Sequence, residues 1–292
     1  MKLADSELPG LFRAADKASL EAQRRFLMAS RLRLVFLVVA AAGGAFSLYI
    51  PRRIDLAAVA TVVALIGAVI VEIWLLTDRP EEAWYDGRAL AESAKTLAWR
   101  FAVGGAPFDN SIDTQTAEMR LIEQLTALLH DAPGSGIGVG NGAAITQPMR
   151  ELRTAGLDER RRAYISERID SQRRWYESKA LHNQKAARRW RLALLAIESA
   201  GVFAALLRAI GVVNIDLAGI AAAIAAAGVA WLSLKQHESL ARAYAYAATE
   251  LALATTRLQN VSNEGEWSTE VDNAESAISR EHTMWRANRT TI

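Results

Sequence analysis

The apolar residues of this chain are concentrated in four windows separated by polar stretches. The windows cover residues 34–50, 56–77, 192–207 and 217–234, and the third continues beyond Arg208. A helix needs about 20 apolar residues to cross a bilayer core of roughly 30 Å. The pattern predicts an all-α integral membrane protein with four transmembrane helices, at about 34–50, 56–77, 192–212 and 217–234. The alternative, four buried helices of a soluble protein, would need a large polar shell.

The four spans come in pairs, because only the short links 51–55 and 208–216 separate the members of each pair. We therefore expect two helical hairpins. Thirteen Lys and Arg residues lie within 15 residues of the spans on the sides away from the links, and the links carry three. The positive-inside rule then predicts that both termini and the middle segment are cytoplasmic. The first 33 residues do not resemble a signal peptide, so the first span is expected to be retained.

The two halves of the chain align at an offset of 158 residues. Residues 31–34 (RLRL) match residues 189–192 (RWRL), and Glu92 falls on Glu250. Both predicted hairpins enter from the same side, which indicates a parallel duplication and not the inverted repeat common in secondary transporters.

The duplication predicts a first domain at 1–131, a glycine-rich linker at 132–147 and a second domain at 148–292. Five glycines alternate with other residues in the linker, at 134, 136, 138, 140 and 142. A phosphate-binding loop would need a strand before it and a helix after it, and the pattern favours neither. A flexible linker is the preferred interpretation.

The polar stretches next to the spans have helical periodicity. One helix is predicted from Pro80 to about Val103, ending at Gly104–Gly105, and another from near Asp158 into the third span. A third follows the last span, with a mostly apolar stripe formed by Tyr244, Ala247, Ala248, Leu251 and Leu258. The spans are therefore expected to extend into a cytoplasmic helical bundle.

The composition excludes most kinds of catalytic site. There are no cysteines, which excludes disulfides, thiolate nucleophiles and iron–sulfur clusters. The four histidines are scattered, and His282 beside Glu281 lacks a nucleophile partner. We expect no enzyme activity, no catalytic residue, no cofactor and no metal. The net charge of +2 is too small to demand a nucleic-acid partner.

Two acidic residues lie inside the spans, Glu72 and Glu198, each five or six residues from the predicted cytoplasmic end. A carboxylate in a bilayer is expected to face protein or water, and rings of carboxylates favour cations. The alternative is an interhelical hydrogen bond or a salt bridge to a juxtamembrane arginine. In the last span Gly219, Ala223 and Ala227 form a row of small residues, which packs helices closely or lines a pore.

Basic residues cluster beside the spans, and anionic lipid headgroups account for most of them. Some could instead bind a nucleotide or oligonucleotide, with aromatic side chains stacking on bases. The candidates for ligand binding are Arg160, Arg161, Arg173, Arg174, Trp175, Tyr176, Lys185 and Arg188.

Four segments resemble those of a known family. WYDGRALAESAKTLAWRFAVGGAPF at 84–108 and YISERIDSQRRWYESKA at 164–180 are similar to cytoplasmic segments of SLATT domains, the SMODS/SLOG-associating two-transmembrane effector domains. AYAYAATEL at 243–251 and AISREHTMW at 277–285 resemble a second SLATT type. The motif residues, with expected structural roles, are Arg88, Glu92, Lys95, Trp99, Arg168, Gln172, Glu250, Arg280, His282 and Trp285.

The resemblance implies two consecutive SLATT domains and a pore-forming effector of a bacterial anti-phage conflict system. It implies a homo-oligomeric, ligand-gated pore that depolarises the inner membrane. The implied partners are further copies of the chain, membrane lipids, and a nucleotide or oligonucleotide made by a nucleotidyltransferase encoded nearby. The alternative from another class is a non-conducting membrane scaffold that recruits a cytoplasmic partner.

Overall fold

The chain is almost entirely helical in the computed structural model, which describes residues 3–50, 54–132 and 142–287. Residues 49–50 and 280–287 are described by their backbone alone. Among these described residues, four helices are long and apolar enough to cross a membrane, which confirms the predicted all-α fold with four candidate transmembrane helices. The strands in the described residues are the short pair β1 (Tyr49–Ile50) and β2 (Ile54–Asp55), antiparallel with Ile50 opposite Ile54.

Two compact units form the molecule, and each is built from both halves of the chain. Unit 1 consists of residues 1–23, 81–180 and 242–292, and unit 2 of residues 24–80 and 181–241. The domain boundaries predicted from the repeat follow the sequence, whereas the compact units cut across them. Most of the predicted linker, residues 133–141, lies outside the described residues.

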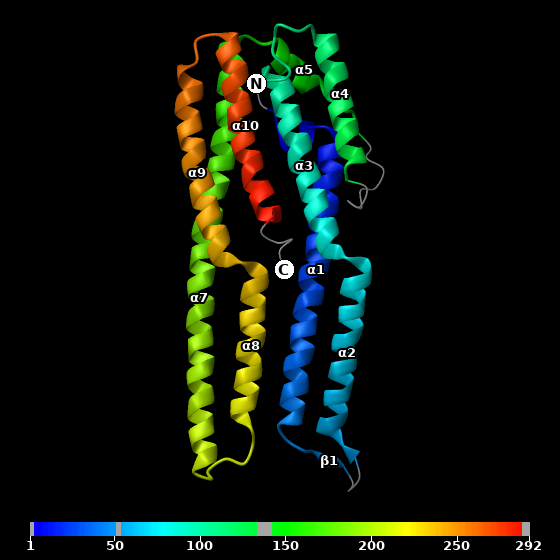
Figure 1. The fold of residues 1–292 in the computed structure, drawn as a ribbon, viewed down its shortest axis with the longest axis vertical. Helices are drawn as coiled ribbons and strands as arrows, with labels where there is room; N and C mark the ends of the chain where they lie inside the picture. The colour runs from blue at the N-terminus through cyan, green and yellow to red at the C-terminus, as the bar shows by residue number, and fades with distance from the viewer. Residues whose placement is uncertain (1–2, 51–53, 133–141, 288–292) are drawn as a thin grey trace. The chain divides into compact units, whose positions relative to one another are not determined.

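Unit 2 contains the membrane-spanning parts of two helical hairpins, and both hairpins turn at the same end of this unit (Figure 1). The first pairs α1 (Gly10–Gly44) with α2 (Leu56–Asp78), and the second pairs α7 (Asp170–Ala209) with α8 (Leu217–Lys235). Asp55 caps the start of α2 by accepting the backbone N–H groups of Ala57 and Ala58, and Asp216 caps α8 through Gly219. These caps fix the residue at which the second span of each hairpin begins, because they satisfy backbone donors that the start of a helix leaves free.

The first and third spans end earlier than the predicted spans at 34–50 and 192–212. Helix α1 ends at Gly44, six residues before the end of its window, because the chain then enters the β1–β2 pair. Helix α7 ends at Ala209, where Gly211 adopts a φ of 77°. Val212 donates its backbone N–H to the Leu207 carbonyl and Gly211 donates to Arg208, which is a Schellman end.

Small residues make the helix contacts in unit 2, while large aliphatic side chains remain exposed. A Cβ on Gly67 would lie 2.8 Å from the Phe36 ring, and one on Gly228 would lie 2.7 Å from a Leu194 methyl group. Val62, Val69 and Ile70 on α2 are all more than half exposed. This arrangement is the reverse of a soluble core and suits a helix bundle surrounded by lipid or neighbouring chains.

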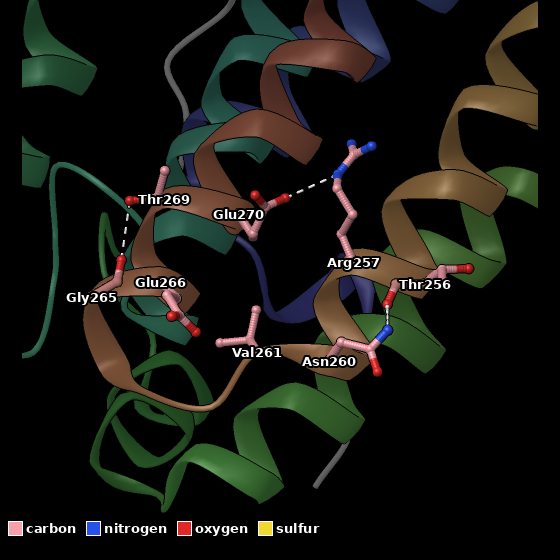
Figure 2. Close-up of a pocket in the computed structure, with 8 residues that line it drawn as sticks. All are labelled: Thr256, Arg257, Asn260, Val261, Gly265, Glu266, Thr269 and Glu270. Atoms are coloured by element: carbon pink, nitrogen blue, oxygen red, sulfur yellow. Dashed lines mark hydrogen bonds and ion pairs between the residues drawn. The ribbon is translucent and has the colours of Figure 1, made fainter.

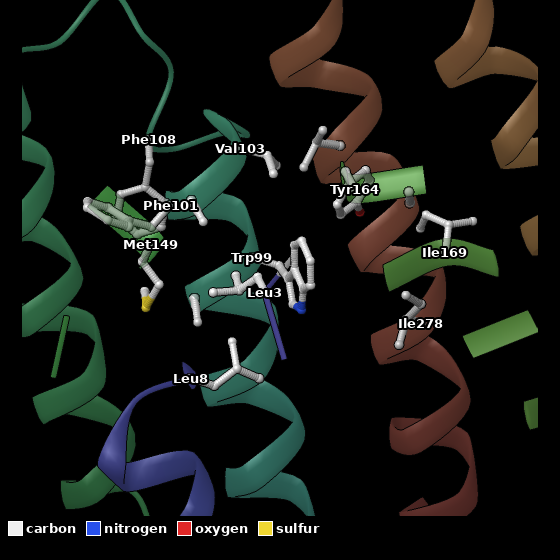
Figure 3. Close-up of a cluster of buried hydrophobic side chains, with 14 of the residues drawn as sticks. Leu3, Leu8, Trp99, Phe101, Val103, Phe108, Met149, Tyr164, Ile169 and Ile278 are labelled. Carbon is white, nitrogen blue, oxygen red and sulfur yellow. The ribbon is translucent and has the colours of Figure 1, made fainter. Parts of the chain in front are cut away.

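Unit 1 has a conventional hydrophobic core. It contains α3 (Pro80–Val103), α4 (Thr114–His130), α5 (Gln147–Thr154), α6 (Leu157–Ala163), the π-helical turn η2 (Tyr164–Ile169), α9 (His237–Asn260, from residue 242) and α10 (Glu264–Ala287), with the first turns of α1 and α7. Trp99, Tyr164, Phe101, Phe108 and Met149 are buried side by side (Figure 3). The stripe predicted on α9 is confirmed, since Ala247, Ala248, Leu251 and Leu258 are buried there.

Helix α3 has the predicted bounds, and its C-terminal end is closed by side chains from the second half of the chain. Gly104 has a φ of 74° and ends the helix. The Val103 carbonyl accepts hydrogen bonds from Arg160 Nη1 at 2.7 Å and from Trp267 Nε1 at 2.7 Å. Arg153 donates to the Phe101 and Phe108 carbonyls. Cationic donors suit this position because the last carbonyls of a helix carry partial negative charge.

Candidate functional site

The first of the two carboxylates inside the spans is paired within its own hairpin. Glu72 on α2 forms an ion pair with Arg33 on α1. This is the interhelical salt bridge that the sequence offered as the alternative to a pore-facing ring. The pair neutralises the carboxylate, which lowers the cost of placing it in a bilayer.

The second carboxylate, Glu198 on α7, is exposed. Within the described part of the chain, no hydrogen bond or ion pair reaches its side chain. Leu195 and Val202 lie three residues before it and four after it on the same helix face, and they are 60% and 63% exposed. An ionised carboxylate at a helix centre in lipid costs about 2.5–3.5 kcal/mol, and less near the interface. This face therefore requires water or another chain.

The row of small residues predicted on α8 is partly exposed. Gly219 lies against the Asp216 carboxylate that caps the helix, and Ala223 and Ala227 are half-buried. The close approach between α7 and α8 occurs elsewhere, at Gly228 against Leu194 and at Gly201, where a Cβ would lie 3.1 Å from Ala221. The predicted row is therefore not the point of closest approach between α7 and α8.

Two of the predicted ligand-binding arginines are engaged inside unit 1. Arg160 is 1% exposed and donates to the Ala155 and Val103 carbonyls and to the Glu264 carboxylate. Arg161 donates to the Val261 carbonyl at 2.7 Å and pairs with Asp158. In this conformation both residues hold the chain together and offer little to a ligand.

The aromatic pair proposed to stack on bases belongs to an internal cluster. Tyr176 is fully buried, and its ring centroid lies 5.3 Å from that of Trp175 and 5.7 Å from that of Tyr244. Trp175 is 37% exposed, and the Lys179 ammonium lies over its ring. One edge of Trp175 can therefore meet a ligand, whereas Tyr176 cannot.

The other predicted basic residues differ in exposure. Arg173 forms ion pairs with Asp170 and Glu177 on its own helix. Arg174, Lys185 and Arg188 are exposed on α7. No described residue forms a side-chain hydrogen bond or ion pair with these three, so they can meet lipid headgroups or a soluble anion.

A buried polar junction lies where α3, η2 and α10 meet in unit 1. Arg168 and Glu275 form an ion pair whose side chains are 1% and 0% exposed. Arg168 Nε and Nη2 donate to the two Glu275 oxygens at 2.9 and 2.7 Å. Tyr164 and Thr96 donate their hydroxyls to the same carboxylate at 3.0 and 2.8 Å. One carboxylate thus joins three elements that are far apart in the sequence.

Burial sets the protonation of this junction. It raises the pKa of the Tyr164 hydroxyl well above its usual value near 10, and the neighbouring Glu275 carboxylate raises it further. Burial alone would lower the pKa of Arg168, but the Glu275 carboxylate outweighs it and raises that pKa. The arginine is charged and the tyrosine neutral at physiological pH.

The remaining motif residues have structural surroundings where their side chains are described. Arg88 pairs with Asp16 and Glu92, and Lys95 pairs with Asp5 at 2.7 Å. Trp99 is buried, and Gln172 and Glu250 are half-buried. The side chains of Arg280, His282 and Trp285 lie outside the described residues.

Two surface grooves border α10 in unit 1. The first, of about 520 Å³, lies between α9 and α10, and the ion pair between Arg257 and Glu270 crosses it (Figure 2). The second, of about 400 Å³, lies between α3 and α10 and includes Thr96 and Arg100. Among the residues that the structure describes, no cluster of His, Asp and Glu could hold a metal ion.

Family models match nearly the whole chain. Residues 9–161 match the SMODS and SLOG-associating 2TM effector domain 3, and residues 164–285 match domain 1 of the same series. The chain belongs to the SLATT family. No curated protein and no solved structure matched the chain.

The buried junction joins the two SLATT domains. Thr96 comes from the first matched region, while Tyr164, Arg168 and Glu275 come from the second. The second match begins at Tyr164, the first residue of η2. π-Helical turns are uncommon and occur often at functional sites. Both SLATT domains therefore contribute side chains to one buried polar centre.

Sequence analysis predicted the helices that contain Thr96, Tyr164 and Arg168 but did not pair these residues with Glu275. Glu275 and Arg168 are 107 residues apart in the sequence, so no local spacing pairs them. The residue that it missed entirely is Arg100, which binds α10 through Asp272. The signal that could have indicated Glu275 is its position on the face of Ile278, an otherwise apolar stripe.

Proposed function

We propose that this SLATT protein is a homo-oligomeric, ligand-gated pore of the bacterial inner membrane, with Glu198 facing a path for cations. When open it depolarises the membrane as the effector of an anti-phage defence system. The signal is a nucleotide or oligonucleotide made in trans by a nucleotidyltransferase. Both termini and unit 1 lie in the cytoplasm, in keeping with the excess of Lys and Arg on that side of the spans.

The observation that supports the pore best is the unpaired, exposed Glu198. Its neighbours on the helix face are apolar and exposed, so the carboxylate faces lipid in a single chain. Assembly into a ring removes this cost if the carboxylates of several copies point into a shared aqueous path. Rings of acidic side chains attract cations, and four spans are few for a pore within one chain.

The exposed apolar faces of unit 2 support oligomerisation in the same way. Large side chains on α2 and α7 point away from the chain, and the small residues Ala223 and Ala227 on α8 are partly exposed. Small residues let helices of neighbouring copies approach closely. The partner we propose is a second copy of this chain, with lipid on the remaining faces.

Gating requires that the ligand bind one state better than the other. Helix α7 connects the buried junction to the proposed pore, because it follows the Arg168 turn directly and contains Glu198 in its membrane-spanning part. A change at the buried junction therefore acts on the helix that carries the proposed pore carboxylate. The exposed Arg174, Lys185 and Arg188 on the same helix are candidate contacts for a polyanionic signal.

The test is cation flux through liposomes that contain the purified full chain, with and without nucleotides and oligonucleotides. Glu198→Gln is expected to reduce cation flux and cation selectivity severalfold, because it removes the ring of charge. Ser199→Ala is the matched control, since Ser199 is exposed beside Glu198 and its hydroxyl bonds only to the Leu195 carbonyl of its own helix in the described structure. Glu72→Gln should lower stability and leave flux per inserted chain unchanged.

Two results contradict the proposal. If wild-type protein conducts and Glu198→Gln conducts equally with equal selectivity, Glu198 does not line the path. If wild-type protein stays silent with every ligand although it is inserted and assembled, a non-conducting scaffold explains the chain better.

A further inference from the structure

The groove between α3 and α10 is lined mainly by hydrogen-bonding side chains. Its polar lining consists of one guanidinium and four hydroxyls: Arg100, Ser93, Thr96, Ser276 and Ser279. Its volume of about 400 Å³ falls within the range of small-molecule sites. A groove with this lining suits a ligand that is rich in hydrogen-bond acceptors.

Arg100 has an incomplete set of partners. Its Nη2 atom contacts the Asp272 carboxylate at 2.7 Å and donates to the Ser276 hydroxyl at 3.2 Å. Its Nε atom is buried and has no acceptor among the described residues. A guanidinium normally presents two parallel donors to one acceptor group, as it does toward a carboxylate or a phosphate. Here Nη2 contacts Asp272 and Ser276 on α10, and Nε donates to no described residue.

We infer that this groove binds a phosphorylated small molecule of nucleotide size, and that the ligand competes with Asp272 for Arg100. The phosphoryl group accepts Nε and Nη2 together once the guanidinium turns into the groove. The Ser93 and Ser276 hydroxyls supply further donors to its oxygens. This inference rests on the proposed function, because it names the site at which the pore is regulated.

Displacing Asp272 is feasible because of its exposure. The Asp272 side chain is 42% exposed and can be solvated again when it leaves Arg100. An ion pair in which one partner is this open to water contributes little to stability. A phosphoryl group offers Arg100 two parallel charge-assisted hydrogen bonds in place of the contacts that Nη2 alone makes with Asp272 and Ser276, so the exchange favours the ligand.

The groove shares a side chain with the buried junction, which connects ligand binding to gating. Thr96 lines the groove, and its hydroxyl donates to Glu275. Ser276, the Arg100 partner on α10, follows Glu275 directly. A ligand that draws Arg100 away from α10 therefore removes the contact next to Glu275. This loss weakens the contact between α3 and α10 beside the ion pair of Arg168 with Glu275.

The experiment is isothermal titration of ADP and of inorganic pyrophosphate into the full chain in detergent, with sulfate as the control for nonspecific anion binding. Wild-type protein is expected to bind ADP and pyrophosphate saturably and sulfate far more weakly. Arg100→Gln should weaken binding at least tenfold. Asp272→Asn should tighten it severalfold, because it removes the competitor and its charge.

The two variants form a matched pair, since both break the same ion pair and disturb folding to a similar degree. Their opposite effects on affinity therefore separate a ligand contact from a loss of structure. Arg257→Gln is the control in the other groove, where Arg257 pairs with Glu270, and it should leave affinity unchanged.

Absence of saturable binding by both probes would overturn the inference, as would equal binding by wild-type protein and Arg100→Gln. Weaker binding in Asp272→Asn would exclude competition, and loss of binding in Arg257→Gln alone would move the site to the other groove. Flux is recorded on the same preparations. Binding without flux leaves this site intact and counts against the pore, whereas flux without binding does the reverse.

Discussion

Removing the charge of Glu275 tests how much the buried junction contributes to the free energy of unfolding. In Glu275→Gln, the Arg168 guanidinium stays buried without its counter-charge, and the carboxylate that accepts four hydrogen bonds is lost. Both side chains of the pair are at most 1% exposed, so water cannot compensate. Breaking such a pair costs about 3–5 kcal/mol. This is a large share of the roughly 5–15 kcal/mol that stabilises a typical domain.

The assay is thermal unfolding of the purified chain in detergent, followed by tryptophan fluorescence. A loss of 3–5 kcal/mol corresponds to a fall in Tm of roughly 6–20 °C for a unit of this size. Trp99 and Trp267 report on the correct region, because their rings lie 5.9 and 5.8 Å from Tyr164. Thr249→Ala is a suitable control, since it alters one exposed hydroxyl on α9.

A double-variant cycle separates the ion pair from general damage. Arg168→Met combined with Glu275→Leu removes both charges, leaving mainly the Tyr164 and Thr96 hydroxyls without an acceptor, at about 1–3 kcal/mol each. The double variant should therefore be clearly more stable than the sum of the single variants predicts. A Tm for Glu275→Gln within about 2 °C of wild type, or strictly additive losses in the cycle, would falsify the reasoning.

Three further outcomes follow from the packing and from the pKa of Tyr164. Gly105→Ala should cost about 1–3 kcal/mol, because its Cβ would lie 2.3 Å from a Val271 methyl group, and Val271→Ala in the same chain should recover part of this loss in denaturation. Gly67→Ala should weaken the first hairpin by a similar amount, with recovery by Phe36→Leu in thermal unfolding, since the Phe36 ring occupies that space. The raised pKa of Tyr164 means that unfolded chains release its proton near pH 10 while folded chains keep it, so stability falls as the pH rises above 10. Between pH 8 and pH 11 the free energy of unfolding of Tyr164→Phe should therefore fall by about 1 kcal/mol less than that of wild type. Equal falls would show that the pKa of this tyrosine is not raised in the folded chain.

Local pattern was enough to predict those helices whose ends are set by neighbouring residues. The predicted bounds of α3 agree with the structure, since Pro80 can only begin a helix and Gly104 adopts a left-handed conformation that ends it. The spans at 56–77 and 217–234 also agree within one residue, because an aspartate caps each start. The spans that end early do so through turn geometry after the helix, which hydropathy does not record.

The candidate site was less predictable, because its partners are distant in the sequence. Nothing near Glu72 or Glu198 distinguishes the carboxylate that pairs with an arginine from the one that does not. Arg160 looks like a member of a basic surface cluster, yet it is buried against Val103, 57 residues earlier. Burial of a charged residue depends on tertiary contacts that supply its acceptors, and those contacts have no local signature.

Both compact units draw on both halves of the chain, so the protein has the organisation of a covalently linked pseudo-dimer. In the proposed oligomer the order of symmetry equals the number of chains, while the membrane part contains twice as many hairpins, of two kinds. Glu72 and Glu198 then occupy non-equivalent positions around the same ring. Native mass measurement of the assembly gives the number of chains, and the number of hairpins around any central path is twice that number.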